Sequence, residues 1–472
     1  MFLLPDEVLS AVLARVETVK DRNSFSVVCR RFYEMDRIHR NHLKVGCGLH
    51  PAHQALLSLC KRFSHLSSVE IAYSGWLSSD GEQIGDEGLF ILATVCTSLT
   101  KLSLNFCGFI RDPGLAKLAN LGANLEVLLL NFIPGITGRG LLSLVSGCQR
   151  ITTLKLTRCM QVKSMEWLEL LGRKGRLEHL SIKHCKGIGE ADLGKLGNGW
   201  RGLQEFYFEV DPTQRYTEVF VAKDSVSQQH EPICKKLRVL SLKNCLANPS
   251  QGLAQVLMHS EALVRLHLDT CIGVRDEDMV LIAMRCTQLK YLSLRVPSNY
   301  TMSARQREAA KLTDASLKSI AEHCLQLEEV AICSVDGDFP SFASFSGVGV
   351  SAMVQWCSLL RRLTLDAPYS FSDSCMQVIC ASESLEILQL ARCQEVSDLG
   401  MGFVAKSHLC ELHLCQCLGI TDAGFAPLLG SNKLARLLVQ DCPAISESGI
   451  LGVAKTVVYK SGDRSGVDFT VL

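Results

Sequence analysis

Four residues near the end of the chain carry side chains that can bind a metal ion. Cys410, His413, Cys415 and Cys417 lie close together in the sequence, and tetrahedral sets of Cys and His are typical zinc ligands. The segment that contains them has the pattern of a short strand, in which successive side chains point to opposite faces. Cys417 ends the strand facing inward, whereas His413 and Cys415 face the other side. One ion could not reach all four, so we expect no metal site.

Two adjacent pairs have the residue types of catalytic groups. His184-Cys185 could be a base beside a nucleophile, and Glu328-Glu329 could be paired carboxylates. Cys185, however, occupies a position that recurs along the whole chain, and the two Glu lie at the start of a strand, where neighbours point in different directions. The sequence also has no Gly-rich phosphate-binding loop with its Lys. We expect a protein without catalytic residues.

A pattern with a period near 26 residues dominates the sequence, L-x-x-L-x-L-x-x-C followed by a polar turn, a Gly-Leu pair and a helical stretch. Alternating apolar residues such as Leu102 and Leu104 predict a short strand with one buried face. Polar residues such as Thr421 and Asp422 then predict a helix cap. Fourteen copies begin at Leu66, Leu99, Leu125, Ile151, Leu177, Leu203, Leu237, Leu263, Leu289, Leu327, Leu360, Leu385, Leu409 and Leu434.

One such unit cannot bury its own apolar face, whereas stacked units form one continuous core. The sequence therefore predicts an α/β fold, a horseshoe-shaped solenoid of about 14 repeats with parallel strands on the concave side and helices on the convex side. The segment after Phe208 departs from the pattern, because it lacks a clear Gly-Leu helix.

The 22 Cys follow the repeat. Small, weakly polar thiols suit tight interior positions, so we expect most of them to be packing residues. A chain so rich in Cys without a secretion signal is expected in a reducing compartment, the nucleus or the cytoplasm. Eight Cys close a predicted strand (107, 159, 185, 245, 271, 393, 417 and 442), and six precede the next strand by three residues (96, 148, 234, 286, 324 and 357).

Charge and hydropathy exclude two classes of partner. Lys plus Arg number 49 and Asp plus Glu 48, a formal net charge of +1, so no overall field would attract nucleic acid or an acidic membrane. No apolar run is long enough to cross a bilayer, and the apolar start runs at once into Pro5. We expect neither nucleic acid nor membrane as a partner.

Residues 4–35 do not follow the repeat. Apolar residues from Leu4 to Leu13 lie on one helical stripe, and Pro5 suits the first turn of a helix. A bundle this small cannot cover so many aliphatic side chains, so a partner is expected to cover the rest. The alternative is that the bundle only caps the first repeat.

This segment resembles an F-box, whose pattern opens with Leu-Pro-x-Glu and closes with Val-Cys-Arg/Lys-x-Trp; here Phe32 stands in place of the Trp. The repeats resemble the cysteine-containing leucine-rich repeats of F-box proteins. The resemblance implies an F-box at 1–45, a solenoid at 46–455 and a C-terminal cap at 456–472. It also implies that the Skp adaptor, and through it cullin, binds at Leu4, Pro5, Glu7, Val8, Leu9, Val12, Val28, Cys29 and Phe32.

Residues 20–24 further resemble the F-box of the plant auxin and jasmonate co-receptors. In those proteins the concave floor holds inositol hexakisphosphate, so the resemblance leaves an inositol phosphate open as a ligand, although we expect no cofactor. It indicates a plant-like lineage more than a particular ligand.

Alternation sends positions 3, 5 and 7 of each strand to the concave lining, which is polar and locally basic. Insertions near 75–84, 212–233, 297–311 and 336–347 follow strands and should share one edge. An acidic or phosphorylated target segment would suit this lining, although a merely solvated face is equally compatible with it. The candidate target-binding residues are Lys155, Lys183, Tyr207, Lys243, Arg265, His267, Tyr291, Arg295, Phe339, Phe342 and Phe345.

Three functions are compatible with these features. The first is a non-catalytic substrate receptor of a ubiquitin ligase, which presents an unidentified target protein for ubiquitination and degradation. The second is a small-molecule co-receptor of the same architecture, and the third is a scaffold that uses the solenoid alone.

Overall fold

A computed structural model describes residues 5–16, 18–47, 49–74, 83–121, 124–211, 234–245, 256, 259–296, 312–334, 345–366, 371–430 and 433–460. The chain divides into two compact units. The first comprises residues 1–203 and 209–230, and the second comprises residues 204–208 and 231–472.

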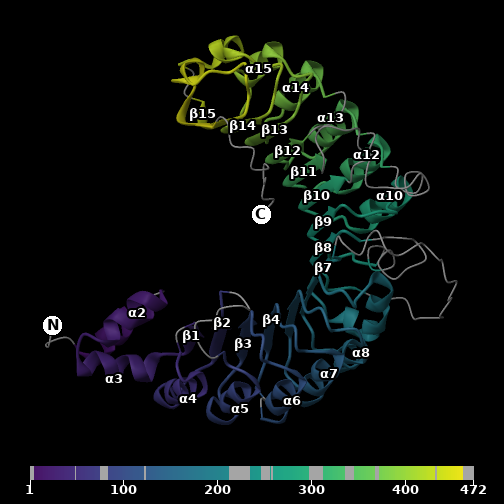
Figure 1. The fold of residues 1–472 in the computed structure, drawn as a ribbon. Helices are drawn as coiled ribbons and strands as arrows, with labels where there is room; N and C mark the ends of the chain where they lie inside the picture. Colours follow the sequence, from purple (N-terminus) through teal and green to yellow (C-terminus); the bar gives the residue numbers. More distant parts are fainter. Residues whose placement is uncertain are drawn as a thin grey trace. The chain divides into compact units, whose positions relative to one another are not determined.

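The first unit begins with three helices and then alternates strands with helices. Strands β1 to β6 pair in parallel and in chain order. Helices α4 to α8 lie along one face of these strands and leave the other face open (Figure 1). The elements are α1 (Asp6–Ala14), α2 (Val19–Ser26), α3 (Arg30–His39), β1 (His42–Gly46), α4 (Ala52–Arg62), β2 (Ser68–Ala72), α5 (Asp86–Val95), β3 (Lys101–Asn105), α6 (Asp112–Leu121), β4 (Val127–Asn131), α7 (Gly138–Gly147), β5 (Thr153–Thr157), α8 (Glu166–Lys174), β6 (His179–Lys183) and the 3₁₀ segment η1 (Glu190–Arg201).

Strand β7 (Glu205–Glu209) lies where the chain divides, and the second unit repeats the same plan. Strands β8 to β16 again pair in parallel and in chain order. The elements are β8 (Val239–Lys243), β9 (Arg265–Asp269), α10 (Asp276–Arg285), β10 (Tyr291–Val296), α12 (Asp314–His323), β11 (Glu329–Ser334), α13 (Gly347–Trp356), β12 (Arg362–Asp366), α14 (Asp373–Cys380), β13 (Ile387–Ala391), α15 (Asp398–Val404), β14 (Glu411–Cys415), η4 (Asp422–Leu428), β15 (Leu434–Gln440), η5 (Ser448–Ile450) and β16 (Ala454–Lys460).

The predicted repeat fold is confirmed, since each of the fourteen copies of the sequence motif forms one strand, from β2 to β15. Two further strands lack the motif. β1 pairs with β2 and begins at His42, before the solenoid boundary predicted at residue 46. β16 pairs with β15 and ends at Lys460, beyond the boundary predicted at residue 455. The repeat region is therefore longer at both ends than the motif alone indicates.

The strands alternate as predicted. In β3, Leu102 and Leu104 are fully buried, whereas Lys101 is exposed and Ser103 partly so. Complete burial of one such Leu contributes about 1.5 to 3 kcal/mol. Repeated in every strand, this burial builds the continuous core beneath the open face of each unit.

The residue that precedes the strand-closing Cys extends the sheet beyond the strand. This residue has a left-handed conformation in many repeats, with φ of 57° at Phe106 and 54° at Arg392. The turn directs its N–H to the last strand of the next repeat, so that Phe106 donates to the carbonyl of Asn131 at 2.9 Å and Arg392 to that of Cys415 at 2.8 Å.

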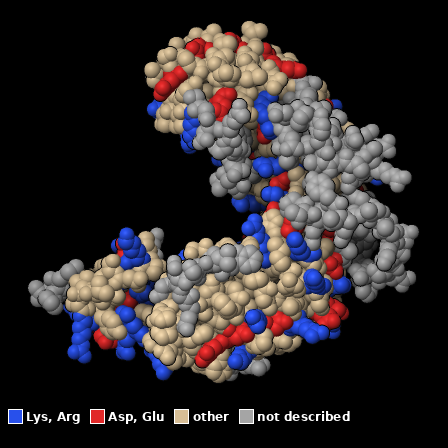
Figure 2. Space-filling view, in the orientation of Figure 1, with Lys and Arg blue, Asp and Glu red and all other residues tan. Residues whose placement is uncertain are grey.

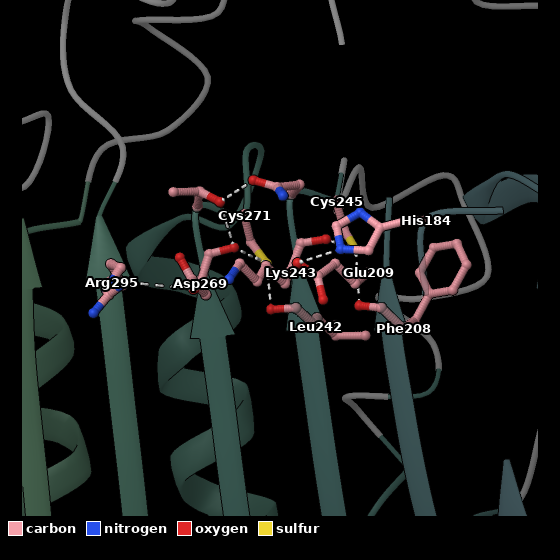
Figure 3. A network of polar contacts seen from close by, with 11 residues as sticks. His184, Phe208, Glu209, Leu242, Lys243, Cys245, Asp269, Cys271 and Arg295 are labelled. Carbon is pink, nitrogen blue, oxygen red and sulfur yellow. Dashed lines mark hydrogen bonds and ion pairs between the residues drawn. The ribbon is translucent and has the colours of Figure 1, made fainter. Parts of the chain in front are cut away.

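The strand-closing Cys then bonds in the opposite direction. The thiol of Cys271 donates to the carbonyl of Leu242 in the preceding strand at 3.3 Å, and that of Cys245 donates to Phe208 at 3.7 Å (Figure 3). The Cys that end the helices use the same bond, since Cys286 donates to Ser260 at 3.2 Å. These Cys are packing residues, as predicted, and they are also weak donors that satisfy buried carbonyls.

Successive helices are linked through an Asp in the first turn of one and the cap of the next. Thr421 caps η4 as predicted, because its hydroxyl accepts from the N–H of Ala423 at 3.2 Å. The same hydroxyl and the backbone N–H of Thr421 both donate to Asp398, each at 2.7 Å. Equivalent pairs join Asp112 to Thr137, Asp276 to Thr313, Asp314 to Ser346, Asp373 to Ser397 and Asp422 to Ser446.

This link also explains the Gly of the recurring Gly-Leu pair. A Cβ on Gly424 would lie 2.6 Å from the Oδ1 of Asp398, closer than real Cβ atoms approach. The Gly therefore leaves room for the carboxylate of the preceding repeat.

Candidate functional site

The three N-terminal helices enclose a small apolar core made by Leu9, Leu13, Phe32 and Met35. The ring of Phe32 stacks on Phe25 with 4.1 Å between centroids. Leu9 is 2% exposed and Phe32 5%, so the expectation that these two side chains contact a partner is revised. They hold the bundle together, because in so small a module the largest apolar groups are needed for its own core.

Four valines that this core leaves out are exposed, and we call them the valine cluster. It consists of Val8 and Val12 on α1 and Val27 and Val28 before α3. Their exposed fractions are 42%, 46%, 81% and 62%. Val8 and Val12 are one turn apart on α1, and Val27 and Val28 are consecutive. Exposed aliphatic residues on a small module are typical of an interaction surface. Val27 was not among the predicted contacts, because nothing in the helical stripe or the motif marks it.

The remaining predicted contact residues of this module differ in their exposure. Pro5 and Glu7 are exposed, and Cys29 is partly buried against the bundle core. Leu4 lies outside the described residues. Contact of all these side chains with an adaptor stays a prediction.

A buried carboxylate joins this module to the first repeat. Asp36 on α3 is fully buried, and its Oδ2 lies 2.9 Å from Nη2 of Arg40 and 3.7 Å from Nη2 of Arg62 on α4. Nε of Arg22 on α2 lies 3.4 Å from the other carboxylate oxygen. The guanidinium of Arg62 also covers the ring of Tyr33 at 3.8 Å. Three cations from two helices of the bundle and the first repeat thus share one anion.

The predicted target residues of the first unit lie on its open face. Lys155 on β5 is exposed, and Lys183 on β6 is partly exposed. The register pairs Lys155 with Ser181 and Thr157 with Lys183. Both lysines therefore project from neighbouring strands, as predicted.

The open face of the second unit is less basic than its lysines and arginines suggest. Asp269 lies between two of the predicted cations, with its Oδ2 3.4 Å from Nζ of Lys243 and 4.0 Å from Nη1 of Arg295 (Figure 3). The guanidinium of Arg265 lies 4.3 Å from the ring centroid of Tyr291. The expectation of a basic strip is therefore revised in this unit, because a carboxylate and a ring already accompany three of the cations.

Burial changes the ionisation of two predicted residues on this face. It lowers the pKa of His267, and the nearby Arg265 acts in the same direction. Burial and then the carboxylate of Glu205 raise the pKa of Tyr207. Both side chains are therefore held in their neutral forms near neutral pH.

A chain of polar contacts crosses the later strands of the second unit. The hydroxyl of Thr364 donates to Oε1 of Gln389 at 3.0 Å, and the amide nitrogen of Gln389 lies 3.0 Å from Nδ1 of His413. Burial lowers the pKa of His413. Nearby, Arg392 binds both oxygens of Asp366, at 2.8 and 2.7 Å. These contacts fix side chains on the open face without bringing a nucleophile to a base.

The ligand-type residues near His413 are separated. Cys410 is exposed, whereas Cys415 and Cys417 are buried, and Cys417 donates to the carbonyl of Leu390. Among the described residues, no group of three or more His, Cys, Asp or Glu is arranged to hold a metal ion. Within the same part of the chain, no helix combines the length and apolarity that a membrane span requires.

The predicted aromatic loop is only partly described. Phe345 is 4% exposed, which agrees with the alternative that the aromatic residues of this loop fold back onto the solenoid edge; their role in target binding stays a prediction. Phe345 lies two residues before α13 and packs inward there. Phe339 and Phe342 lie outside the described residues, as do most of the four predicted insertions.

Charged residues of both signs occur on the visible face of the first unit (Figure 2). Asp and Glu form a line across its helices, with Lys and Arg beside them. The helix-covered face thus has no single-signed surface in this view.

Two family models match the chain, one at the N-terminal helical module and one within the repeats. The F-box family model matches residues 2–42, which include the helices that carry the valine cluster. A leucine-rich-repeat family model matches residues 95–119. Both predicted resemblances are therefore confirmed.

Two rice proteins are similar to most of the chain. Coronatine-insensitive protein homolog 1b of Oryza sativa subsp. japonica is 23% identical over 525 residues, which cover 93% of this chain and 81% of that protein. Homolog 1a of Oryza sativa subsp. indica is 25% identical over 524 residues, covering 95% and 86%. This similarity agrees with the predicted plant-like lineage.

Two solved structures are more distant. The Rad7 and Elc1 complex of yeast matches with a TM-score of 0.43 at 14% identity, covering 94% of this chain and 88% of that chain. An internalin of Listeria monocytogenes also has a TM-score of 0.43, at 15% identity with 92% and 94% coverage.

Proposed function

We propose that this chain is the substrate-recognition subunit of a ubiquitin ligase of the Skp-cullin-F-box type. The observation that carries the proposal is the valine cluster: four exposed valines on a module that matches the F-box model, followed directly by leucine-rich repeats. Exposed aliphatic residues of this kind are stabilised when a partner covers them. The Skp adaptor is that partner, and cullin joins through it.

The mechanism is positioning. A target held on the repeats has its lysines at a high effective concentration near the charged conjugating enzyme, so the receptor itself supplies no acid, base or nucleophile. The Asp36 cluster contributes by fixing the F-box module on the first repeat. The open strand faces, which project polar side chains from successive strands, hold the target protein.

The similarity to the rice proteins supports a second candidate. Their name refers to coronatine, and the similarity covers nearly the whole chain. In this second candidate function, a small ligand on the open face completes the surface that the target recognises. Native mass spectrometry of the purified chain would show whether a small ligand copurifies with it. A binding measurement then distinguishes the two candidates, because only a co-receptor would gain target affinity on adding its ligand.

The proposed function is tested by purifying the tagged chain from cells treated with a proteasome inhibitor. The full chain should recover the Skp adaptor and cullin, and a version lacking residues 1–45 should recover neither. Equal recovery by both versions would contradict the proposal and favour a scaffold.

A further inference from the structure

Four consecutive repeats of the first unit carry large side chains at the left-handed turn position, the last of them His184, which lies 3.3 Å from Glu209. The first three are Phe106, Phe132 and Arg158, with φ of 57°, 58° and 53°. The rings of Phe106 and Phe132 stack with 5.1 Å between centroids, and the guanidinium of Arg158 lies 5.8 Å from the centroid of Phe132. We call these three residues the aromatic edge. It follows the carboxyl ends of β3, β4 and β5.

The repeat needs the left-handed backbone at this position but does not need a ring. Bulky residues are disfavoured there by about 1 to 2 kcal/mol, whereas Asn is well tolerated. Other repeats of this chain have Asn244 and Asp441 at the same place. Phe106 and Phe132 are also partly exposed. Their rings are therefore not explained by the turn.

The strands beside the aromatic edge project positive charge. Lys155 and Lys183 lie at open-face positions of β5 and β6, and Arg158 is exposed. None of the residues at positions 3, 5 and 7 of β3 to β6 is Asp or Glu. Glu126 and Glu178 precede their strands. Asp112, which follows β3, accepts from the N–H and hydroxyl of Thr137, and Glu70 on β2 pairs with Lys44.

The second unit provides a contrast. There Asp269 accompanies Lys243 and Arg295, and Asp366 accompanies Arg392. No described ion pair joins Lys155 to a carboxylate. Among the described residues, Lys155 and Arg158 thus have no carboxylate partner of the kind that Asp269 and Asp366 provide in the second unit.

We propose that the aromatic edge and the lysines beside it bind an acidic, extended segment of a protein that also carries an apolar or aromatic side chain. The proposal rests on the proposed function and names the class of target segment. Carboxylates of the segment pair with Arg158 and Lys155, and the apolar side chain contacts Phe106 and Phe132.

Single-stranded nucleic acid fits the same surface less well. Bases bind by stacking on exposed aromatic faces. The ring of Phe132 already stacks on Phe106 and lies 5.8 Å from the guanidinium of Arg158, which leaves it less ring face for a base than an isolated ring offers.

The test uses the full chain in complex with the Skp adaptor and a display library of short random peptides as the probe. We expect the selected peptides to be enriched in Asp and Glu and to contain an apolar or aromatic residue. A labelled peptide from the selection should bind the Phe106→Asn, Phe132→Asn double variant and the Lys155→Glu variant at least about tenfold more weakly, as measured by fluorescence polarisation. Asn keeps the left-handed turn, so the double variant should fold and melt no lower than wild type.

The matched control is Gln416→Asn, which makes the same kind of change at the equivalent turn of the second unit. It should leave binding unchanged. Peptides without acidic enrichment, equal binding by all variants, or competition by an oligonucleotide that depends on the two Phe would each overturn the proposal. Adaptor binding is measured in parallel: its loss with peptide binding intact would count against the proposed function and not against this site.

Discussion

Asp398 and Thr421 lie in successive repeats, and the N–H and hydroxyl of Thr421 both donate to the carboxylate of Asp398 at 2.7 Å. One carboxylate thereby positions the cap of the next helix. Equivalent pairs recur in both units. Successive repeats are therefore linked by side-chain hydrogen bonds between their helices as well as by strand pairing.

Replacing Asp398 should loosen the repeat that follows it. Asp398→Ala removes two hydrogen bonds to a charged acceptor, and we expect a loss of about 1 to 3 kcal/mol. Because repeats can open separately, hydrogen exchange at the amides of residues 421–424 is the appropriate measurement. Thr421→Ala in a double-mutant cycle should show strong coupling to Asp398, whereas strict additivity would contradict the link.

Two glycines of α15 should respond in opposite directions to Ala. A Cβ on Gly400 would lie 2.5 Å from Oδ1 of Asp373, whereas a Cβ on Gly402 would have nothing within 4 Å. Gly400→Ala should therefore destabilise, and Gly402→Ala should stabilise by about 0.5 to 1 kcal/mol through helix propensity. Urea unfolding of the two variants compares them directly. Equal effects would show that the Gly is not required by the neighbouring Asp.

Asp36 should be essential to the stability of the N-terminal module. Asp36→Asn leaves Arg22, Arg40 and Arg62 near one another without their anion, and breaking a buried ion pair in this way costs about 3 to 5 kcal/mol. Glu34→Gln on the same helix is the control, since its pair with Arg37 is exposed and worth under about 1 kcal/mol. Hydrogen exchange across residues 18–62 should rise only in the Asp36 variant. A rise of the same size in both variants would contradict a role for the cluster.

The cysteines offer a test that joins fold and function. Only Cys47 and Cys410 are exposed, and Cys29 and Cys271 are partly so. Burial raises the pKa of Cys286, Cys324 and Cys333 to about 12, which keeps these thiols protonated and unreactive. Brief alkylation read by mass spectrometry should label Cys47 and Cys410 first, then Cys29 and Cys271. Adaptor binding should protect Cys29 and leave Cys410 unchanged; labelling of Cys29 at the same rate in the complex would contradict adaptor binding at this face.

The repeat made most of the fold predictable. Leu and Cys recur at fixed spacing because every repeat buries the same positions, so all fourteen motif copies became strands. β1 and β16 were missed because a terminal strand has only one neighbour and does not need the full motif: β1 has only Leu43 and Val45 inward.

The site was less predictable, because it depends on contacts between residues distant in sequence. A helical stripe contains Leu9 and Val8 alike, and only packing against Phe32 and Met35 shows which one is buried. The pairing of Asp269 with Lys243 and Arg295 likewise depends on strand register, which a list of cationic residues does not contain.

Binding of the Skp adaptor to the valine cluster is tested most directly by an affinity measurement. Purified wild-type chain and the Val12→Asp, Val28→Asp double variant are titrated with the adaptor by calorimetry. Val348→Asp is the control, since this valine is 60% exposed on α13, far along the chain. We predict that the double variant binds at least about a hundredfold more weakly while folding normally, since its two sites are exposed, and that the control binds as wild type. Unchanged adaptor affinity in the folded double variant would contradict the account.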